Sequence, residues 1–137
     1  MSKENKNLYQ RMTTEIWNKG NLDAIDQFFA PDVIIHSAPP EWPTGSAGVK
    51  ATVSMWRGAL PDFELTSEFV VGEGDKVANY WTISGTHSGE LMGVPATGNR
   101  IEIYGMSLVR IEGGKIVEIW SASDQLGLMR TLGVLPS

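Results

Sequence analysis

Apolar residues recur at helical spacing near the start of the chain. Leu8, Met12 and Ile16 follow an i, i+4, i+8 pattern, which predicts a helix from about residue 3 to residue 18. Gly20 follows directly and supplies the left-handed conformation that commonly ends a helix. The first element is therefore expected to be an amphipathic helix with one buried face.

The next forty residues alternate between short apolar stretches and a turn-rich segment. Asn21 is in position to cap a second, short helix over 22–29, which Ala-Pro then closes. A β-branched strand is expected at 32–37, and prolines make 38–48 a loop. Apolar spacing predicts a third helix at 49–60, which ends at Pro-Asp.

After residue 62 the pattern changes to β-branched and aromatic residues separated by glycine turns, which is typical of long antiparallel hairpins. A short helical turn at 126–132, closed by Gly133, ends the pattern. The expected strands are 63–71, 77–87, 100–112 and 115–124.

Helices followed by a meander of long strands indicate an α+β fold, with the N-terminal helices packed on a strongly curved antiparallel sheet that encloses a pocket. The chain has 137 residues, of which 42% are hydrophobic and 20% charged, and it shows no internal repeat or linker. We therefore expect a single domain over 1–137.

Charge and composition exclude several classes of function. The formal net charge is -5 and basic residues are scattered, so nucleic acid is not expected as a partner. There is no cysteine, no HxxxH pair and no phosphate-binding glycine loop, so no metal or nucleotide site is expected. No apolar run is long enough to cross a bilayer and no signal-peptide pattern begins the sequence, so we expect a cytoplasmic protein without membrane contact.

General acid–base chemistry by carboxylates remains, and Asp124 is the leading candidate. If the Gly-Gly turn at 113–114 makes a simple hairpin, Asp124 shares a face with Trp120, and these residues pair with Ile103 and Ser107. Apolar surroundings would make the carboxylate a better proton acceptor near neutral pH. An equally weighted alternative is that Asp124 caps the helix that follows it.

Three other polar residues are candidates for supporting roles. His36 ends the first expected strand beside the proline loop, and either a catalytic or a structural, hydrogen-bonded role is open. His87 precedes the Gly- and Pro-bearing segment 88–99, which is either a lid or a connector. Arg110 is a charged residue within an apolar strand, so it either reaches solvent or pairs with a carboxylate.

Several segments together resemble the SnoaL-like polyketide cyclases, also called ester cyclases, of the nuclear transport factor 2-like (NTF2-like) superfamily. The resemblance covers nearly the whole chain. The segments that carry it are WNKGNLD at 17–23, LPDF at 60–63, GEGDKV at 72–77, GTHSGELMGVPATG at 85–98 and GKIVEIW at 114–120, with Asp124 beyond.

The resemblance implies a cone-shaped α+β domain, commonly a homodimer packed through its sheets, and a cofactor-free intramolecular aldol closure of a polyketide ester. It places the acid/base role on Asp124 and leaves Arg110 where a supporting histidine is discussed, so His36 or His87 is a candidate for that role. The expected ligand is a small, hydrophobic, carbonyl-containing molecule. Candidate pocket walls are Trp42, Trp56, Trp81, Met92, Tyr104 and Trp120.

Two alternatives stay open. One is another enzyme on the same fold, such as an epoxide hydrolase or isomerase, in which Arg110 would lie between two buried aspartates and act with Asp124. The other is a non-catalytic module that binds a small molecule, or a dimerisation domain, because one fold hosts many functions.

Overall fold

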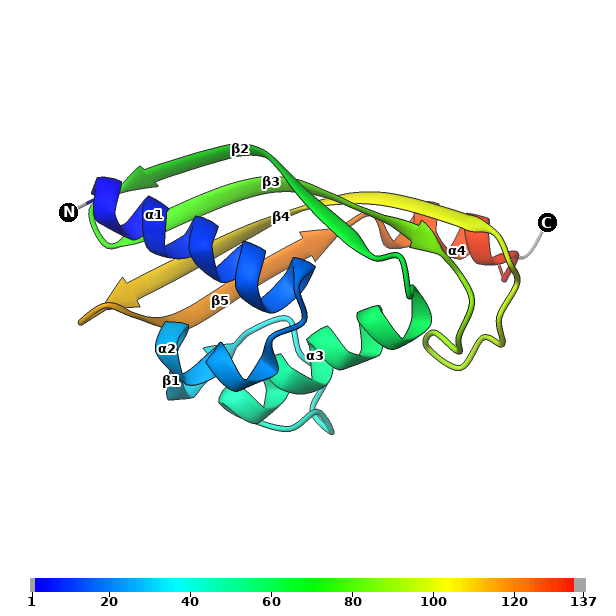
Figure 1. The fold of residues 1–137 in the computed structure, drawn as a ribbon, viewed down its shortest axis with the longest axis horizontal. Coiled ribbons are helices and arrows are strands. Elements are labelled where there is room, and N and C mark those ends of the chain that lie inside the picture. Colours follow the sequence, from blue (N-terminus) through cyan, green and yellow to red (C-terminus); the bar gives the residue numbers. More distant parts are fainter. Residues whose placement is uncertain (1, 135–137) are drawn as a thin grey trace.

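The computed structural model describes residues 2–134, which form helices packed against one long, curved sheet (Figure 1). The sheet order is β1-β5-β4-β3-β2. The strands are β1 (Phe29–Ile35), β2 (Glu64–Glu73), β3 (Lys76–Thr86), β4 (Arg100–Glu112) and β5 (Lys115–Ser123). The expected α+β class, with N-terminal helices covering a curved sheet, is confirmed.

The sheet is mixed, because β1 runs parallel to β5 while the other neighbours are antiparallel. The expectation of a purely antiparallel sheet was therefore wrong for its first strand. The chain leaves β1, passes through α3 (Ser46–Ala59) and then makes three hairpin-type reversals before β5. This route returns β5 to the side of β1 in the same direction.

The N-terminal helix is α1 (Ser2–Met12), and it continues as a wider π-helical turn, η1 (Thr13–Asn18). The second helical segment is shorter than expected, with η2 (Leu22–Ala24) and α2 (Ile25–Phe28), because Phe29 already belongs to β1. Asn21 makes no side-chain cap there, and its amide instead reaches Glu15 at 3.5 Å. The expected cap by Asn21 was therefore wrong.

The hairpin turns form where glycine permits left-handed backbone. Gly113 and Gly114 have φ of 59° and 77°, as a two-residue turn requires, and Glu112 pairs with Lys115 as expected. The last helix is α4 (Gln125–Leu132), and Gly133 at φ 73° ends it, as the sequence predicted.

The core fills the inner face of the sheet, which we define as the face toward α1 and α3. One cluster joins α1, α2 and β1 to the strands around Val77 and Ile116, and a second joins α3 and α4 to Leu91, Ile101 and Ile103. Strand β3 shows the alternation clearly, since Val77, Asn79, Trp81, Ile83 and Gly85 are buried and the residues between them are not.

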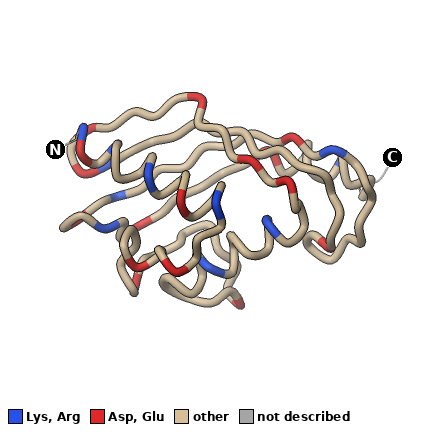
Figure 2. Tube along the Cα trace, viewed as in Figure 1, with Lys and Arg blue, Asp and Glu red and all other residues tan. Residues whose placement is uncertain are grey.

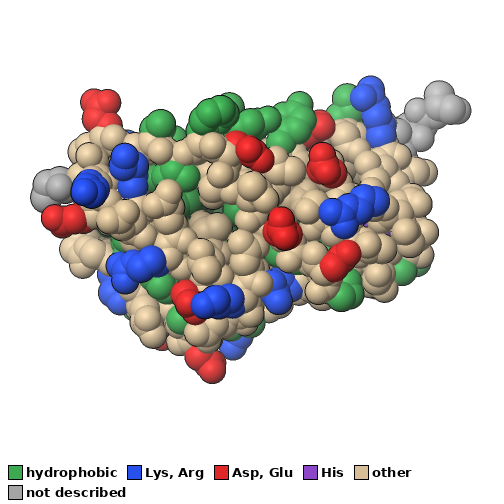
Figure 3. Space-filling model, turned by 45° about the horizontal axis from the view of Figure 1, so that its top comes forward, with side chains coloured by type: hydrophobic (Ala, Val, Ile, Leu, Met, Phe, Trp, Pro, Cys, Tyr) green, Lys and Arg blue, Asp and Glu red, His purple; other side chains and the backbone are tan. Residues whose placement is uncertain are grey.

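The opposite, outer face of the sheet carries exposed apolar side chains on β2 and β4. Phe69 and Met106 are 67% and 64% exposed, and Tyr104, Val71 and Leu108 accompany them. Figure 3 shows hydrophobic side chains along this upper surface.

Acidic and basic residues are interspersed along the rest of the trace (Figure 2). No helix within residues 2–134 is long and apolar enough to cross a membrane.

Candidate functional site

Asp124 lies at the junction of β5 and α4. Its backbone N–H donates to the Tyr104 carbonyl at 3.0 Å, and its side-chain Oδ1 accepts from the Gly127 N–H at 2.9 Å. The carboxylate is thus the N-cap of α4, which is one of the two roles expected from the sequence. A Cβ at position 127 would lie 2.1 Å from Oδ2, so glycine is what allows the carboxylate this close to the helix.

The carboxylate of Asp124 is half-buried, and its cap is the only hydrogen bond that the described residues give it. It takes part in no ion pair within residues 2–134. Oδ2 is therefore not committed to a protein donor, and a carboxylate in that state can accept a proton from a ligand.

The expected strand partners of Asp124 were wrong by one position. A bulge in β5 at Val117 shifts the register between Arg110 and Ile111, so Trp120 pairs with Leu108. The residue across from Asp124 is accordingly Tyr104, whose carbonyl accepts from the Asp124 N–H. Ile103 pairs with Ile83 and belongs to the core. The apolar neighbourhood that the simple hairpin predicted for Asp124 is therefore not formed by Ile103.

His36, Glu118 and Arg110 form a hydrogen-bonded chain at the outer face. His36 Nε2 lies 2.7 Å from Glu118 Oε2, and Arg110 Nε donates to Glu118 Oε1 at 2.8 Å. The hydrogen bonds from His36 and Arg110 hold the pKa of Glu118 below its ordinary value, and the bonds to Glu118 and Glu112 raise the pKa of Arg110. The Trp120 ring stacks on His36 with centroids 4.7 Å apart.

Arg110 lies far from Asp124. Arg110 and Tyr104 are six positions apart on β4, which is about 20 Å at ~3.4 Å per residue. The two partners of Arg110 are glutamates, Glu118 and Glu112, so the bracket of two aspartates required by the hydrolase alternative is not what surrounds it. Of the two expectations for this arginine, pairing with a carboxylate is confirmed.

His87 is fully buried below the segment 88–99. Its Nδ1 accepts from the Thr97 N–H at 3.2 Å and lies 2.9 Å from the Thr97 hydroxyl, while Nε2 has no partner among the described residues. Above it, the Ser88 and Gly89 N–H groups both donate to the Ala59 carbonyl at the end of α3. These bonds fasten the segment to α3, which favours the connector over the lid.

The residues expected to line one pocket are distributed over the molecule. Trp56 and Trp81 are buried in the second core cluster, whereas Tyr104 and Met92 are exposed. Trp42 is half-buried and donates its indole N–H to the Gly48 carbonyl and the Thr52 hydroxyl on α3. Their role as substrate walls stays a prediction.

A polar cluster on the inner face of the sheet was missed by the sequence reasoning. Asn79 donates through Nδ2 to the Tyr9 phenol at 3.2 Å and to Ser67 at 3.1 Å. Trp81 donates its indole N–H to Ser107 Oγ at 2.9 Å, and Ser107 Oγ lies 2.9 Å from Ser121 Oγ. The available signal was the asparagine, which falls on the inward parity of an otherwise apolar strand.

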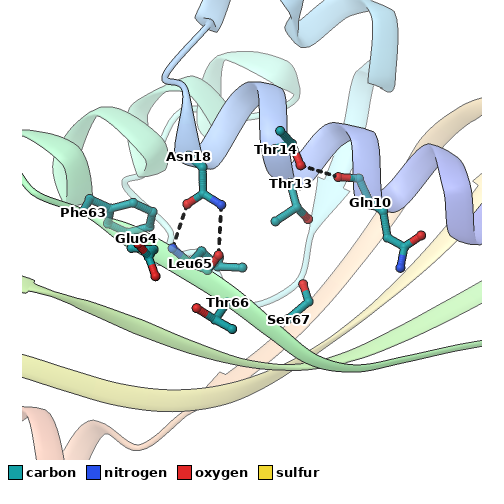
Figure 4. A pocket seen from close by; sticks show the side chains of 9 residues that line it. All are labelled: Gln10, Thr13, Thr14, Asn18, Phe63, Glu64, Leu65, Thr66 and Ser67. Atoms are coloured by element: carbon teal, nitrogen blue, oxygen red, sulfur yellow. Dashed lines mark hydrogen bonds between the residues drawn. The ribbon is translucent and has the colours of Figure 1, made fainter.

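A cleft of about 550 Å³ lies between η1 and β2 (Figure 4). Its wall is held by Asn18, whose amide accepts from the Leu65 N–H at 2.7 Å and donates to the Leu65 carbonyl at 2.9 Å. Arg57 of α3 fixes the same turn by donating to the carbonyls of Trp17 and Asn18. The residues lining the cleft are Gln10, Thr13, Thr14, Asn18, Phe63, Glu64, Leu65, Thr66 and Ser67.

A second hollow of about 830 Å³ runs between α1 and α2, and neither hollow contains any of the four residues expected to be catalytic. Within residues 2–134, no three His, Cys, Asp or Glu side chains gather in a group that could hold a metal ion.

Comparison with known proteins identifies the family and the fold of this chain. Residues 7–132 match the family model of the SnoaL-like polyketide cyclases, so the chain belongs to that family. The resemblance seen in the sequence is thereby confirmed.

Individual relatives agree with this assignment. The nogalonic acid methyl ester cyclase of Streptomyces nogalater is 29% identical over 125 residues, covering 85% of this chain and 89% of the relative. The aklanonic acid methyl ester cyclase DauD of Streptomyces sp. (strain C5) is 31% identical over 126 residues, covering 90% and 78%. The structure of TsrD from Streptomyces laurentii superposes with a TM-score of 0.88 at 30% identity, covering 96% of both chains.

Proposed function

We propose that this protein catalyses a cofactor-free, intramolecular aldol-type ring closure of a polyketide ester, with Asp124 as both acid and base. Membership of the polyketide cyclase family and the similarity to two methyl ester cyclases support the reaction class. The observation that carries the assignment of Asp124 is its position: Asp124 is half-buried, one carboxylate oxygen accepts from the Gly127 N–H, and the other has no hydrogen-bond partner among residues 2–134.

The chemistry needs only a proton acceptor and an ordered substrate. A methylene between two carbonyl groups is acidic, so Asp124 can remove its proton and leave an enolate delocalised over the substrate oxygens. The enolate carbon then attacks the second carbonyl carbon, and Asp124 returns the proton to the new alkoxide. Such proton transfer contributes about 10²- to 10⁴-fold to a rate, and binding in the reactive geometry supplies much of the rest.

The cap geometry offers a sharp test. Asparagine and aspartate cap helices about equally well, so Asp124→Asn keeps α4 in place but cannot shuttle a proton. With aklanonic or nogalonic acid methyl ester as substrate, chromatography at constant mass detects ring closure, because an aldol closure is an isomerisation. We expect kcat/KM to fall about 10²- to 10⁴-fold in Asp124→Asn with the melting temperature unchanged.

The matched variant is Asp124→Ala, which removes the cap as well as the acid and is expected to lose about 1 kcal/mol of stability in addition. If Asp124→Asn cyclises either ester as fast as the wild type, Asp124 is a cap only and the proposed mechanism is wrong.

A second candidate function, non-catalytic binding of a small molecule, is favoured by the same contact, since the helix cap alone gives Asp124 a complete structural role. That function predicts saturable binding of the two esters, no turnover by the wild type, and no change in affinity in Asp124→Asn.

The outer face of the sheet supports a homodimer. Contiguous exposed apolar surface is uncommon on a monomer. On this face Phe69 stacks on Tyr80, and Tyr80 meets Tyr104 edge to face, across three strands. A second copy of the same sheet is the complementary partner in a two-fold contact. Light scattering after size-exclusion chromatography should give a dimer for the wild type and a monomer for Met106→Asp. Met92→Asp, at an exposed methionine on the 88–99 segment, is the control and should stay dimeric.

A further inference from the structure

The cleft between η1 and β2 is lined mainly by uncharged polar side chains. Six of its nine lining residues are threonine, serine, asparagine or glutamine, one is the exposed Glu64, and none is basic. Phe63 and Leu65 supply the apolar part. The volume of about 550 Å³ lies within the range of small-molecule sites, roughly 300–1,000 Å³. The cleft therefore has the size for a small ligand and the chemistry for a neutral one that forms hydrogen bonds.

The walls of the cleft are held in place by contacts between η1 and β2. Asn18 binds both the N–H and the carbonyl of Leu65, on the edge strand of the sheet. The Trp17 ring stacks on Phe63 with ring centroids 5.9 Å apart. The cleft is thus formed before any ligand arrives, as small-molecule sites usually are.

The helical wall of the cleft has an unusual backbone. In η1 the Lys19 N–H donates to the Thr14 carbonyl, five residues earlier, which is the hydrogen bond of a π-helix. Such turns are rare and frequently occur at functional sites. Three of the lining residues, Thr13, Thr14 and Asn18, belong to this turn.

The hydroxyl groups on the two walls have opposite capacities for hydrogen bonding. On the helical wall, Thr13 and Thr14 donate their protons to the carbonyls four residues earlier, at 3.1 and 3.2 Å, so their oxygens remain as acceptors. On the strand wall, Ser67 Oγ accepts from Asn79 Nδ2 at 3.1 Å. No hydrogen bond within residues 2–134 uses the Ser67 hydroxyl proton, so this hydroxyl is available as a donor.

Figure 4 shows the side chains of Thr13, from η1, and Ser67, from β2, pointing toward one another across the cleft. A ligand hydroxyl between them can donate to Thr13 Oγ1 and accept from the Ser67 hydroxyl. A carbonyl oxygen has no proton to give to Thr13, and an ammonium group has no lone pair for Ser67. The two side chains together therefore favour a hydroxyl group over either alternative.

We infer that this cleft binds a neutral, saturated ring that carries several hydroxyl groups, such as a sugar, with one hydroxyl held between Thr13 and Ser67. The carboxylate of Glu64 and the amide of Gln10 offer partners for neighbouring hydroxyls, and Phe63 offers apolar contact for the C–H groups of the ring.

A flat phenol also carries hydroxyl groups, but its apolar faces would meet a lining that is mostly polar, so a saturated ring fits better. The cleft does not include Asp124, which lies at the junction of β5 and α4. Ligand binding here is thus independent of the proposed ring closure.

The test uses methyl α-D-glucopyranoside, because this probe is neutral, carries several hydroxyl groups and has a closed ring. Titrated into the intact ¹⁵N-labelled protein, it should saturably shift the backbone amides of Leu65 and Ser67 and the side-chain amide of Gln10, with a Kd on the order of 1 mM. Thr13→Val replaces the hydroxyl by a methyl group and should weaken the Kd by about 2- to 10-fold, the range for one lost hydrogen bond. Thr13→Ser keeps a hydroxyl and should bind as the wild type does.

Thr131→Val is the matched control. Thr131 Oγ1 also donates to the carbonyl four residues earlier, at 3.0 Å, but on α4 and outside the cleft. This variant loses the same kind of intrahelical bond as Thr13→Val and should leave the Kd unchanged. Ser67→Ala should weaken the Kd as Thr13→Val does, and its melting temperature is measured in parallel because it also removes a partner of Asn79.

Two further probes test the class of ligand. Methyl α-D-glucopyranosiduronate adds a carboxylate and should bind more weakly than the glucoside, because Glu64 is negative and no basic residue lines the cleft. Phloroglucinol carries its hydroxyls on a flat ring, and tighter binding of this phenol than of the glucoside would contradict a saturated ligand. A wild-type protein without saturable shifts, or a Thr13→Val variant that binds the glucoside with unchanged Kd, overturns the inference.

Discussion

Leu91 fastens the 88–99 segment to the core, and truncating it tests whether this segment is a fixed connector. Its side chain is 0% exposed and packs in the second core cluster with residues of α3 and α4. Leu91 and Val94 also exchange both backbone hydrogen bonds, at 3.0 and 2.9 Å, which closes a tight turn around Met92 and Gly93. The segment is therefore anchored by a buried side chain at its own tip.

Leu91→Ala should lower the free energy of unfolding by about 3 kcal/mol. Truncating a buried leucine costs ~2–5 kcal/mol, and Leu91 is completely buried. For a chain of this length, that free energy corresponds to a melting temperature lower by about 10 °C. Urea unfolding and thermal melting both measure it. The matched control is Met92→Ala, which truncates the exposed neighbour at the same turn and should change stability by less than about 0.5 kcal/mol.

A lid that is open for much of the time would give a different result. Leu91 would then be exposed in the dominant state, its truncation would cost no more than that of Met92, and the amide hydrogens of Ser88 and Gly89 would exchange as fast as those of an unstructured loop. Equal stabilities for the two variants would refute the description of this segment as part of the core.

Three other predictions concern the elements around the site. Asn18→Ala should lower the free energy of unfolding by about 1–3 kcal/mol in urea, because the Leu65 N–H and carbonyl both lose their partner. The pKa of Glu118 is lowered in the folded state, so its stabilisation is present at neutral pH and is lost as the pH falls from 4.5 downward. The difference in melting temperature between wild type and Glu118→Gln should shrink over that range, and a constant difference would contradict it. Gly89→Ala should destabilise, because its Cβ would lie 2.6 Å from the Gly58 carbonyl oxygen, whereas Gly58→Ala meets nothing within 4 Å and should stabilise α3 by up to about 1 kcal/mol in the same melts.

Local patterns in the sequence predicted most of the secondary structure. Helical spacing located α1 and α3, and the glycines at 113–114 and 133 placed a hairpin turn and a helix end where the structure has them. These signals are local, since each depends on residues within one turn of helix or one reversal of the chain.

Long-range pairing was harder to predict. Whether β1 runs parallel or antiparallel to β5 depends on the path of the chain between them, and nothing in 29–35 encodes it. The sequence gives no sign of the bulge at Val117, because valine suits a regular strand. The bulge nevertheless shifts every pairing partner of β5 beyond it by one position relative to a simple hairpin.

The candidate site was predictable only in part. The cap by Asp124 followed from an acidic residue before a helical stretch, and the ion pair of Arg110 followed from a charge in an apolar strand. The polar cluster around Asn79 and Ser107 was not foreseen, because it joins a helix and three strands that are far apart in sequence and its members are ordinary strand and helix residues.

The bulge at Val117 makes the two halves of β5 independent of each other for protein engineering. Before it, Ile116 is locked into the core, while beyond it the residues near the free edge can be exchanged without repacking that isoleucine. A one-residue deletion at 117 would remove the extra residue of the bulge and leave the later pairs as they are, because Glu118 would then follow Ile116 directly and still pair with Arg110. Ser121 would keep facing inward and Trp120 outward, so position 117 is a place where β5 can lose one codon without changing which side chains its inner face presents.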